Sequence, residues 1–314
     1  MIAEKIAADL GLNTDYVLRV ARSASFRYKT YEIPKKRDPK LKRTINHPAR
    51  ELKLLQRWIV RNVISHLPVH RCAMAYKKNS SILKNALWHR RSNYLLKVDF
   101  QDFFPSVTGT DVTALLRENS SRLSGVVSGP VDLQVIRRLV CKNDRLTIGA
   151  PSSPSLCNAI MFTFDTVWYE KCRAQGVTFS RYADDLYFST SKPDVLAPLL
   201  KDLRKTLKQQ KHPRLVINDP KTVFASRKRR KVVTGLVVTP EGNVSLGRQK
   251  IRHLRSLVFR SIQGPLPISE MNYLRGMLAY ARSIDPQLIE RLRDKFRKKF
   301  GLDVIALLLG DDSV

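Results

Sequence analysis

Apolar residues recur at helical spacing over much of the chain. The clearest case is residues 50–67, where Leu52, Leu55 and Ile59 fall on one helical face and Pro68 follows. This pattern predicts an amphipathic helix that Pro68 ends. Similar patterns predict helices at residues 3–10, 14–24, 194–211, 248–262, 269–282 and 287–299, and a mostly helical segment at 111–143 with a break at 124–130.

Short apolar and aromatic runs alternate with these helices. Residues 26–33 and 41–47 predict two strands joined by a basic loop, and residues 94–100 predict a buried strand. Residues 215–224 and 231–238 predict further strands. Because strands and helices alternate in the middle and helices gather near the C-terminal end, we expect an α+β fold with a sheet layer followed by a helical part.

The stretch RYADDLYFST, residues 181–190, places Asp184 and Asp185 between aromatic flanks, where a hairpin would turn. Aspartate is common in turns because its side chain bonds nearby backbone N–H groups. Two adjacent carboxylates also repel each other unless a cation lies between them or one takes up a proton. The pair therefore fits an ordinary turn or a metal site, and a third carboxylate would favour the metal.

Asp99 supplies a third carboxylate, at the end of the predicted strand at residues 94–100. Alone, an aspartate at a strand end is typical of a cap. If this strand lies beside the hairpin, Asp99 and Asp184 can share divalent cations, and Mg²⁺ prefers such oxygen ligands together with substrate phosphates. Two ions about 3.5–4 Å apart would clamp the attacking and leaving oxygens of a phosphoryl transfer.

The charge of the chain indicates a polyanionic partner. Among its 314 residues, 57 Lys and Arg outnumber 27 Asp and Glu, for a formal net charge of +30. Such an excess repels itself in a compact fold, so nucleic acid is the expected partner and an anionic membrane surface is the alternative. The apolar run at residues 304–309 is too short to span a membrane.

The spacing of the cysteines and the N-terminal stretch indicate the cellular compartment in which the protein is expected. The four cysteines lack C-x-x-C spacing, so we expect neither a zinc site nor a disulfide framework. The N-terminal stretch has no apolar core of signal-peptide length. We therefore expect a soluble chain in the reducing cytoplasm.

An ordered series of blocks resembles the reverse transcriptase family. Asp99 and the YADD sequence at 182–185 resemble motifs A and C of the family's palm. The blocks follow the family's order at residues 41–59 (first fingers block), 99–107 (motif A), 149–158 (motif B), 215–224 (motif D) and 231–238 (motif E). NALWH at 85–89 and VTG at 233–235 further resemble the signatures of bacterial retron reverse transcriptases.

This resemblance implies a right-hand polymerase fold. The fingers would comprise residues 1–95, the palm with its antiparallel sheet residues 96–240, and the helical thumb residues 241–314, with a fingers insertion at about 111–148. The implied activity is RNA-directed DNA synthesis. The template and primer would be one cognate structured non-coding RNA, extended from a 2′-OH to give a branched RNA–DNA product. A separate effector protein and a role in defence against phage are also implied.

The family implies roles for residues that match its motifs. Asp99, Asp184 and Asp185 would be catalytic and, with the backbone carbonyl of Phe100, would bind two Mg²⁺ ions, for which Mn²⁺ can substitute. The alternative for each aspartate is the turn or cap already described. Asp185 would be the weaker ligand of the hairpin pair.

Five residues would bind the incoming deoxynucleotide. Arg43 would hold the triphosphate, since a planar guanidinium suits phosphate; its alternative is one more solvated charge. Phe104 would be the steric gate against a 2′-OH, or else a core aromatic. Lys221 would protonate the leaving pyrophosphate or act as a counter-charge. Gly149 and Pro151 would shape the surface behind the nucleotide.

Basic residues near the C-terminal end are expected to bind RNA. Arg248, Arg252 and Arg255 share one face of the helix predicted at 248–262, opposite an apolar face, so the helix can pack on the protein and contact phosphates. The alternative is a solvated face. The complete set of predicted RNA-binding residues is Asn85, His89, Arg229, Arg230, Arg248, Arg252 and Arg255, of which Asn85 and His89 could instead fix local structure.

One position departs from the family pattern. Motif B usually has Gln before its glycine, but here Ile148 precedes Gly149. Because Ile cannot hydrogen-bond to sugar or base, altered nucleotide contacts are expected. Three alternatives stay open. The first is a reverse transcriptase of the diversity-generating or intron type, against which NALWH and VTG argue. The second is a catalytically silent RNA-binding scaffold, against which the three aspartates argue. The third is a membrane-surface protein, against which the palm motifs argue, so no membrane partner is expected.

Overall fold

A computed structural model describes residues 1–35, 38–210, 212–226 and 228–310. The chain divides into two compact units. The first comprises Met1–Ser80 with Leu96–Phe224, and the second comprises Ser81–Leu95 with Ala225–Val314. Both combine helices with antiparallel strands, in agreement with the predicted α+β class.

The central sheet carries the sequence motifs. Its strands lie in the order β4-β5-β3-β6, and β7 also pairs with β3. β4 pairs with β5, and β3 with β6, in antiparallel fashion. The bounds are β3 (Tyr94–Gln101), β4 (Thr178–Tyr182), β5 (Asp185–Thr190), β6 (Val216–Ile217) and β7 (Val223–Ser226). This order brings the hairpin of β4 and β5 beside the strand that ends near Asp99, which is the condition that the sequence analysis set for a shared site.

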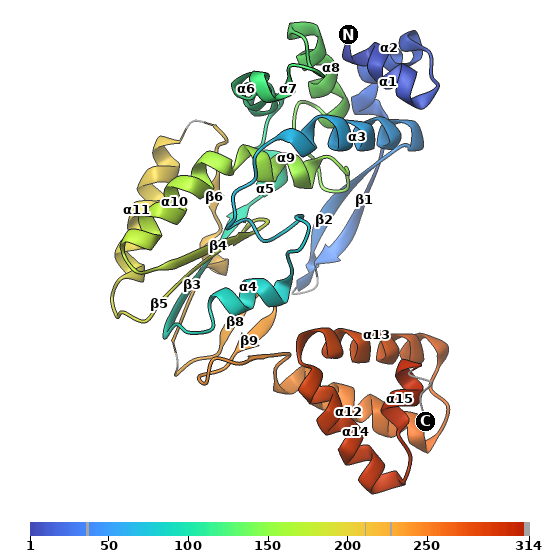
Figure 1. Ribbon diagram of the computed structural model, residues 1–314, viewed down its shortest axis with the longest axis vertical. Helices are drawn as coiled ribbons and strands as arrows, with labels where there is room; N and C mark the ends of the chain where they lie inside the picture. Colours follow the sequence, from blue (N-terminus) through green and yellow to red (C-terminus); the bar gives the residue numbers. More distant parts are fainter. Residues whose placement is uncertain (36–37, 211, 227, 311–314) are drawn as a thin grey trace. The chain divides into compact units, whose positions relative to one another are not determined.

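Aromatic packing fixes the hairpin against a helix. Phe179 of β4 and Phe188 of β5 are directly paired, and their rings stack with centroids 4.9 Å apart. Trp168 of α10 packs edge-on against Phe188, and all three side chains are almost fully buried. Figure 1 shows α10 and α11 beside this hairpin. Large buried rings supply much of the apolar surface that stabilises such a layer.

Ten α-helices of the first unit surround the sheet or extend from it (Figure 1). They are α1 (Ile2–Leu10), α2 (Thr14–Arg22), α3 (Arg50–Asn62), α5 (Phe103–Ser106), α6 (Gly109–Glu118), α7 (Ser120–Leu123), α8 (Pro130–Val140), α9 (Ser153–Ile160), α10 (Phe162–Ala174) and α11 (Leu196–Gln209). Short 3₁₀ turns lie at Ala24–Phe26, Ile64–His66 and Asp219–Lys221. The helix predicted up to Pro68 therefore ends earlier, at Asn62.

The hairpin β1–β2 is longer than the sequence predicts. β1 (Tyr28–Lys35) and β2 (Asp38–Pro48) pair along nearly their whole length, so much of the segment expected to be a basic loop is strand. Residues 36 and 37 lie outside the described part of the chain. Most side chains of this hairpin are exposed, so its basic character did not prevent backbone pairing.

In its described residues, the second unit combines a small sheet with three long helices and two short ones. Strands β8 (Lys231–Val233), β9 (Leu236–Val238) and β10 (Val244–Ser245) form the sheet, beside the short helix α4 (Ile82–Trp88). The remaining helices are α12 (Arg248–Gln263), α13 (Ile268–Ile284), α14 (Pro286–Phe300) and α15 (Val304–Leu309). Among the described helices of the chain, none is long and apolar enough to cross a membrane.

Candidate active site

The sheet brings three carboxylates to one region. Asp99 lies near the end of β3, Asp184 lies in the hairpin turn, and Asp185 begins β5. The backbone N–H of Phe100 donates to the carbonyl of Asp184 over 3.0 Å, which joins β3 directly to the turn. The Asp99 residue is only 5% exposed, so its carboxylate needs a polar partner.

Two lysines neutralise two of these carboxylates. Lys221 Nζ donates to Asp99 Oδ1 over 2.8 Å, and Lys97 Nζ lies 2.7 Å from Asp185 Oδ1. The Tyr187 hydroxyl also donates to Asp185, over 3.0 Å. Each of these two aspartates is therefore already paired with a cation from the protein itself.

The charged form of Asp184 is disfavoured by its surroundings. Burial, followed by repulsion from Asp185 and Asp99, raises the pKa of Asp184 to about 6 from an ordinary 3.8. Burial also raises the pKa of Asp185, against the opposing effect of Lys97. Negative charge accumulates here beyond what the two lysines compensate, so added positive charge would be favourable.

The donor set suits a hard divalent cation, since it consists of carboxylate oxygens beside a backbone carbonyl. Within the residues that the structure describes, however, no three Asp, Glu, His or Cys side chains are gathered closely enough to hold a metal ion. Two of the three carboxylates are held in ion pairs, Asp99 with Lys221 and Asp185 with Lys97. A bound cation would have to compete with both ammonium groups.

Phe103 and Phe104 point into different surroundings. They are the first two residues of the short helix α5. Phe103 is buried and stacks on Phe100, with ring centroids 5.8 Å apart. Phe104 is only partly buried and lies 6.5 Å from the ring of Tyr76. Phe104 is thus the more accessible of the two rings, as a steric gate requires.

Gly149 is required by a close backbone approach. Its φ is +112°, and a Cβ atom there would lie 2.6 Å from the carbonyl oxygen of Asn46. The Asn46 N–H in turn donates to the carbonyl of Ile148 over 2.8 Å. The motif B loop, with Pro151 partly buried just beyond, therefore packs directly against β2.

Arg43 is exposed on β2, opposite Ile33. Burial and then the charge of Asp184 raise the pKa of Tyr76, whereas the charge of Arg43 lowers it. Arg43 and Asp184 thus act on the same hydroxyl group and share one neighbourhood. Tyr76 was not predicted from the sequence; its φ of +56° in a non-glycine residue is the structural sign that marks it.

The predicted RNA-binding residues fall into two groups. Asn85 and His89 are 0% and 1% exposed, and burial lowers the pKa of His89 to about 3. In this structure both side chains are enclosed by protein, which favours the alternative that they fix local structure, and their contact with RNA stays a prediction. Arg229 and Arg230 are exposed, whereas Arg227 of the same basic stretch lies outside the described residues.

The helix predicted at residues 248–262 is confirmed as α12. Its apolar face is buried through Leu254 and Leu257, while the arginines of the opposite face are exposed at positions 248, 252 and 255. A cavity of about 750 Å³ near its first turn is lined by Arg229, Arg230 and Arg248, among others. Gly247 allows this packing, because a Cβ there would lie 2.6 Å from Arg230 Nη2.

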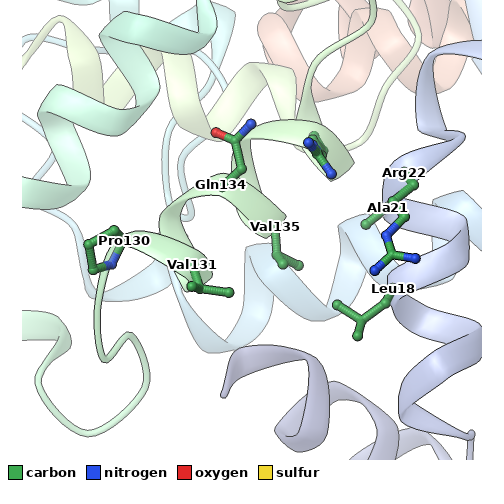
Figure 2. A pocket seen from close by; sticks show the side chains of 8 residues that line it. Leu18, Ala21, Arg22, Pro130, Val131, Gln134 and Val135 are labelled. Carbon is green, nitrogen blue, oxygen red and sulfur yellow. The ribbon is translucent and has the colours of Figure 1, made fainter.

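Another cavity, of about 350 Å³, lies between α2 and α8. Figure 2 shows Leu18, Ala21 and Val135 facing it, with Arg22 at its edge. None of the catalytic, nucleotide-binding or RNA-binding residues predicted from the sequence lines this cavity. This cavity therefore does not belong to the carboxylate region.

Comparison with known proteins identifies the family. Residues 33–254 match the family described as reverse transcriptase (RNA-dependent DNA polymerase). The chain belongs to the reverse transcriptases. It is 36% identical over 283 residues to the retron Ec83 reverse transcriptase of Escherichia coli, covering 89% of this chain and 90% of that one. It is also 33% identical to the retron Ec86 reverse transcriptase of the same species, covering 89% and 84%.

These similarities place the chain among the retron reverse transcriptases, so it is an RNA-directed DNA polymerase. The resemblance stated from the sequence is confirmed, and the silent scaffold and the other reverse transcriptase classes are set aside. A telomerase from Candida tropicalis shares the fold, with a TM-score of 0.53, 11% identity and coverage of 90% of this chain and 58% of that one. The right-hand α+β fold is therefore confirmed as well.

Proposed function

We propose that this reverse transcriptase copies a cognate structured non-coding RNA into DNA, starting from a 2′-OH of that RNA. The product would be a branched RNA–DNA molecule. The main support for a polymerase active site is that Asp99, Asp184 and Asp185 lie on or next to the neighbouring strands β3 and β5. The similarity to the Ec83 and Ec86 retron enzymes over 89% of the chain supports the proposal that a structured non-coding RNA is the template and primer.

In this proposal Asp99, Asp184 and Asp185 are catalytic and, with the Phe100 carbonyl, hold two Mg²⁺ ions. When bound, such ions would stabilise the attacking hydroxyl oxygen and the leaving pyrophosphate. The protein supplies the clustered charge, and the raised pKa of Asp184 shows how strongly that charge lacks compensation. Asp185, paired with both Lys97 and Tyr187, is the weaker ligand of the two hairpin aspartates.

We also propose roles around the nucleotide. Arg43 binds the triphosphate of the incoming deoxynucleotide, and Phe104 excludes a 2′-OH. Gly149 and Pro151 form the surface behind the nucleotide, in the loop that packs on β2. Lys221 neutralises Asp99 in the free protein. In this proposal it neutralises or protonates the leaving pyrophosphate.

The RNA would be bound mainly through exposed arginines of the second unit, at positions 229, 230, 248, 252 and 255. Arginine suits phosphate because its planar fork donates two parallel hydrogen bonds. The division into fingers (1–95), palm (96–240) and thumb (241–314) belongs to this proposal. Family resemblance adds a separate effector protein and a role in defence against phage.

The decisive experiment identifies the nucleic acid bound to the protein and measures DNA synthesis by the unaltered protein and by an aspartate variant. Sequencing the nucleic acid that co-purifies with the protein should reveal DNA joined to RNA through a branch. Asp184→Asn with Asp185→Asn should abolish DNA synthesis and the branched product while RNA binding persists, because only metal-binding charge is lost. The control is Asp194→Asn with Asp294→Asn, which removes the same charge from exposed positions.

Normal extension by the Asp184→Asn, Asp185→Asn protein in Mg²⁺ would refute the assignment of the catalytic aspartates. Linear DNA without an RNA branch, made by the unaltered protein, would refute the proposed 2′-OH priming alone.

A further inference from the structure

A fully buried arginine precedes the catalytic turn. Arg181 lies in β4 and is 0% exposed, as is Asp165 of α10. Arg181 Nε and Nη2 donate to the two carboxylate oxygens of Asp165 over 2.8 and 2.6 Å. This bidentate pair neutralises the guanidinium in a place where an unpaired charge would be very costly.

The remaining nitrogen of the guanidinium reaches the turn itself. Arg181 Nη1 donates to the carbonyl oxygen of Ala183 and to Oδ1 of Asn158, each over 3.2 Å. A guanidinium has five N–H donors, and four of them are accounted for by these bonds. Asn158 uses its own Nδ2 to donate to the carbonyl of Ala75 over 2.8 Å. One buried network therefore joins the turn to the segment that carries Tyr76.

Ala183 is the residue that most needs such support. Its φ is +58°, a left-handed conformation that residues with a Cβ rarely adopt. Its carbonyl belongs to the peptide group that leads into Asp184, so the orientation of that peptide determines where the Asp184 side chain points. The carbonyl of Asp184, in turn, accepts from the Phe100 N–H. Movement of the Ala183 peptide would displace both.

An ion pair whose only role was packing would not need this geometry. Buried pairs can often be replaced by apolar side chains of similar volume without loss of stability. What an apolar pair cannot supply is a donor to the Ala183 carbonyl. The pair is therefore more than a filling for the core between α10 and β4.

We propose that Arg181 is a positioning residue for DNA synthesis: its guanidinium, oriented by Asp165, holds the Ala183 carbonyl and so fixes the peptide that carries Asp184. This inference rests on the proposed catalytic role of Asp184. Arg181 touches neither substrate nor nucleotide in this role. It acts only through the turn.

The test uses two variants of the full-length protein. Arg181→Met with Asp165→Leu removes both charges together, so neither is left unpaired. Arg181→Lys keeps the charge beside Asp165 but loses the planar fork. We expect both proteins to fold, with kcat lowered on the order of 100-fold for the first, since a displacement of about 1 Å in a reacting group can cost that much. The KM for deoxynucleotide should change little.

Hydrogen exchange provides a measurement that does not depend on activity. The Phe100 amide should exchange faster in both variants than in the unaltered protein, relative to amides of the β4–β5 pair, because its acceptor on Asp184 is no longer fixed. Phe179→Leu is the control: it disturbs the same buried strand through the ring of Phe188. It should lower thermal stability and leave kcat and the relative Phe100 exchange unchanged.

Unchanged kcat and Phe100 exchange in Arg181→Lys would overturn the proposal, even if the double variant failed to fold. Equal losses in Phe179→Leu would also overturn it, by showing a general effect of destabilisation. Asp184→Asn separates the two levels of the argument. Full activity in Asp184→Asn would refute the catalytic site, while Phe100 exchange in the Arg181 variants would still report whether Arg181 fixes the turn.

Discussion

The ammonium group of Lys97 lies 2.7 Å from Oδ1 of Asp185, and both side chains are 21% exposed. Because the pair is largely shielded from water, Lys97→Met should leave Asp185 poorly compensated. We expect the free energy of unfolding in a chelator at pH 8 to fall by about 2 kcal/mol, within the range for hydrogen bonds to charged groups. Added Mg²⁺ should restore more thermal stability to the variant than to the unaltered protein, and equal gains would contradict competition by Lys97.

Asp184 should make the metal-free protein less stable at neutral pH. Its pKa is about 6 in the folded protein against an ordinary 3.8, so the folded state binds the proton more tightly and stability falls as pH rises from about 4 to 6. Asp184→Asn should therefore raise the free energy of unfolding by up to about 3 kcal/mol at pH 8. The gain should vanish below pH 4. Thermal unfolding in a chelator across this range checks both, and a gain independent of pH would contradict the shift.

Phe104→Ala should admit ribonucleotides, because the ring that would exclude a 2′-OH is removed. Primer extension with one ribonucleotide replacing its deoxynucleotide measures the effect. Phe103→Leu is the matched control: Phe103 is buried against Phe100, so this change should reduce stability without altering sugar selectivity. Should Phe104→Ala polymerise normally and still reject ribonucleotides, the steric gate must be another residue.

Ile148→Gln restores the residue usual in the family. The backbone carbonyl of Ile148 accepts a hydrogen bond from the Asn46 N–H, and this bond survives the change. We therefore expect an altered KM for deoxynucleotide with little change in melting temperature. Loss of stability without a kinetic change would show that Ile148 serves packing alone.

Changing Arg248, Arg252 and Arg255 together to Gln should weaken RNA binding. If all three contact phosphates, the slope of log K against log salt should flatten by about two units, since each contact contributes about 0.7 in single strands. Stability should persist because the apolar face with Leu254 and Leu257 is untouched. Binding measured across a salt series decides the point.

The matched control for that triple variant removes three charges from another exposed helix face, through Lys201→Gln, Lys205→Gln and Lys208→Gln in α11. If both triple variants flatten the slope equally, net charge alone explains the effect. If the slope of log K against log salt is the same for the unaltered protein and both triple variants, the RNA does not contact this face of α12. Arg229 and Arg230 would then be tested next.

Local patterns predicted the elements well where periodicity and burial agree. The helix expected at 248–262 is α12 at Arg248–Gln263, because its apolar residues are the ones that become buried. The basic segment between the strands predicted at 26–33 and 41–47 was expected to be a loop, yet residues 34–35 belong to β1 and residues 38–40 to β2. Side-chain polarity says little about pairing in a hairpin whose side chains face water, since the backbone supplies the bonds.

The three aspartates could be found from the sequence, but their partners could not. Lys221 pairs with Asp99 across 122 positions of the chain, and Arg181 pairs with Asp165 on a different element. Such pairings depend on how α10 and the Asp219–Lys221 turn pack against the sheet, which no local pattern encodes. A basic residue inside the apolar strand before YADD was the one available sign of Arg181.

The backbone of Arg181 has a consequence for association between molecules. β4 is the outermost strand of its sheet, but its Arg181 N–H donates to the carbonyl of Cys72 and its carbonyl accepts from the N–H of Met74. The segment at 72–74 thus covers this edge with a short parallel bridge. Exposed edges are templates on which a second chain can extend a sheet. At Arg181, on the strand that leads to Asp184 and Asp185, the protein's own chain occupies the edge that a second chain would need.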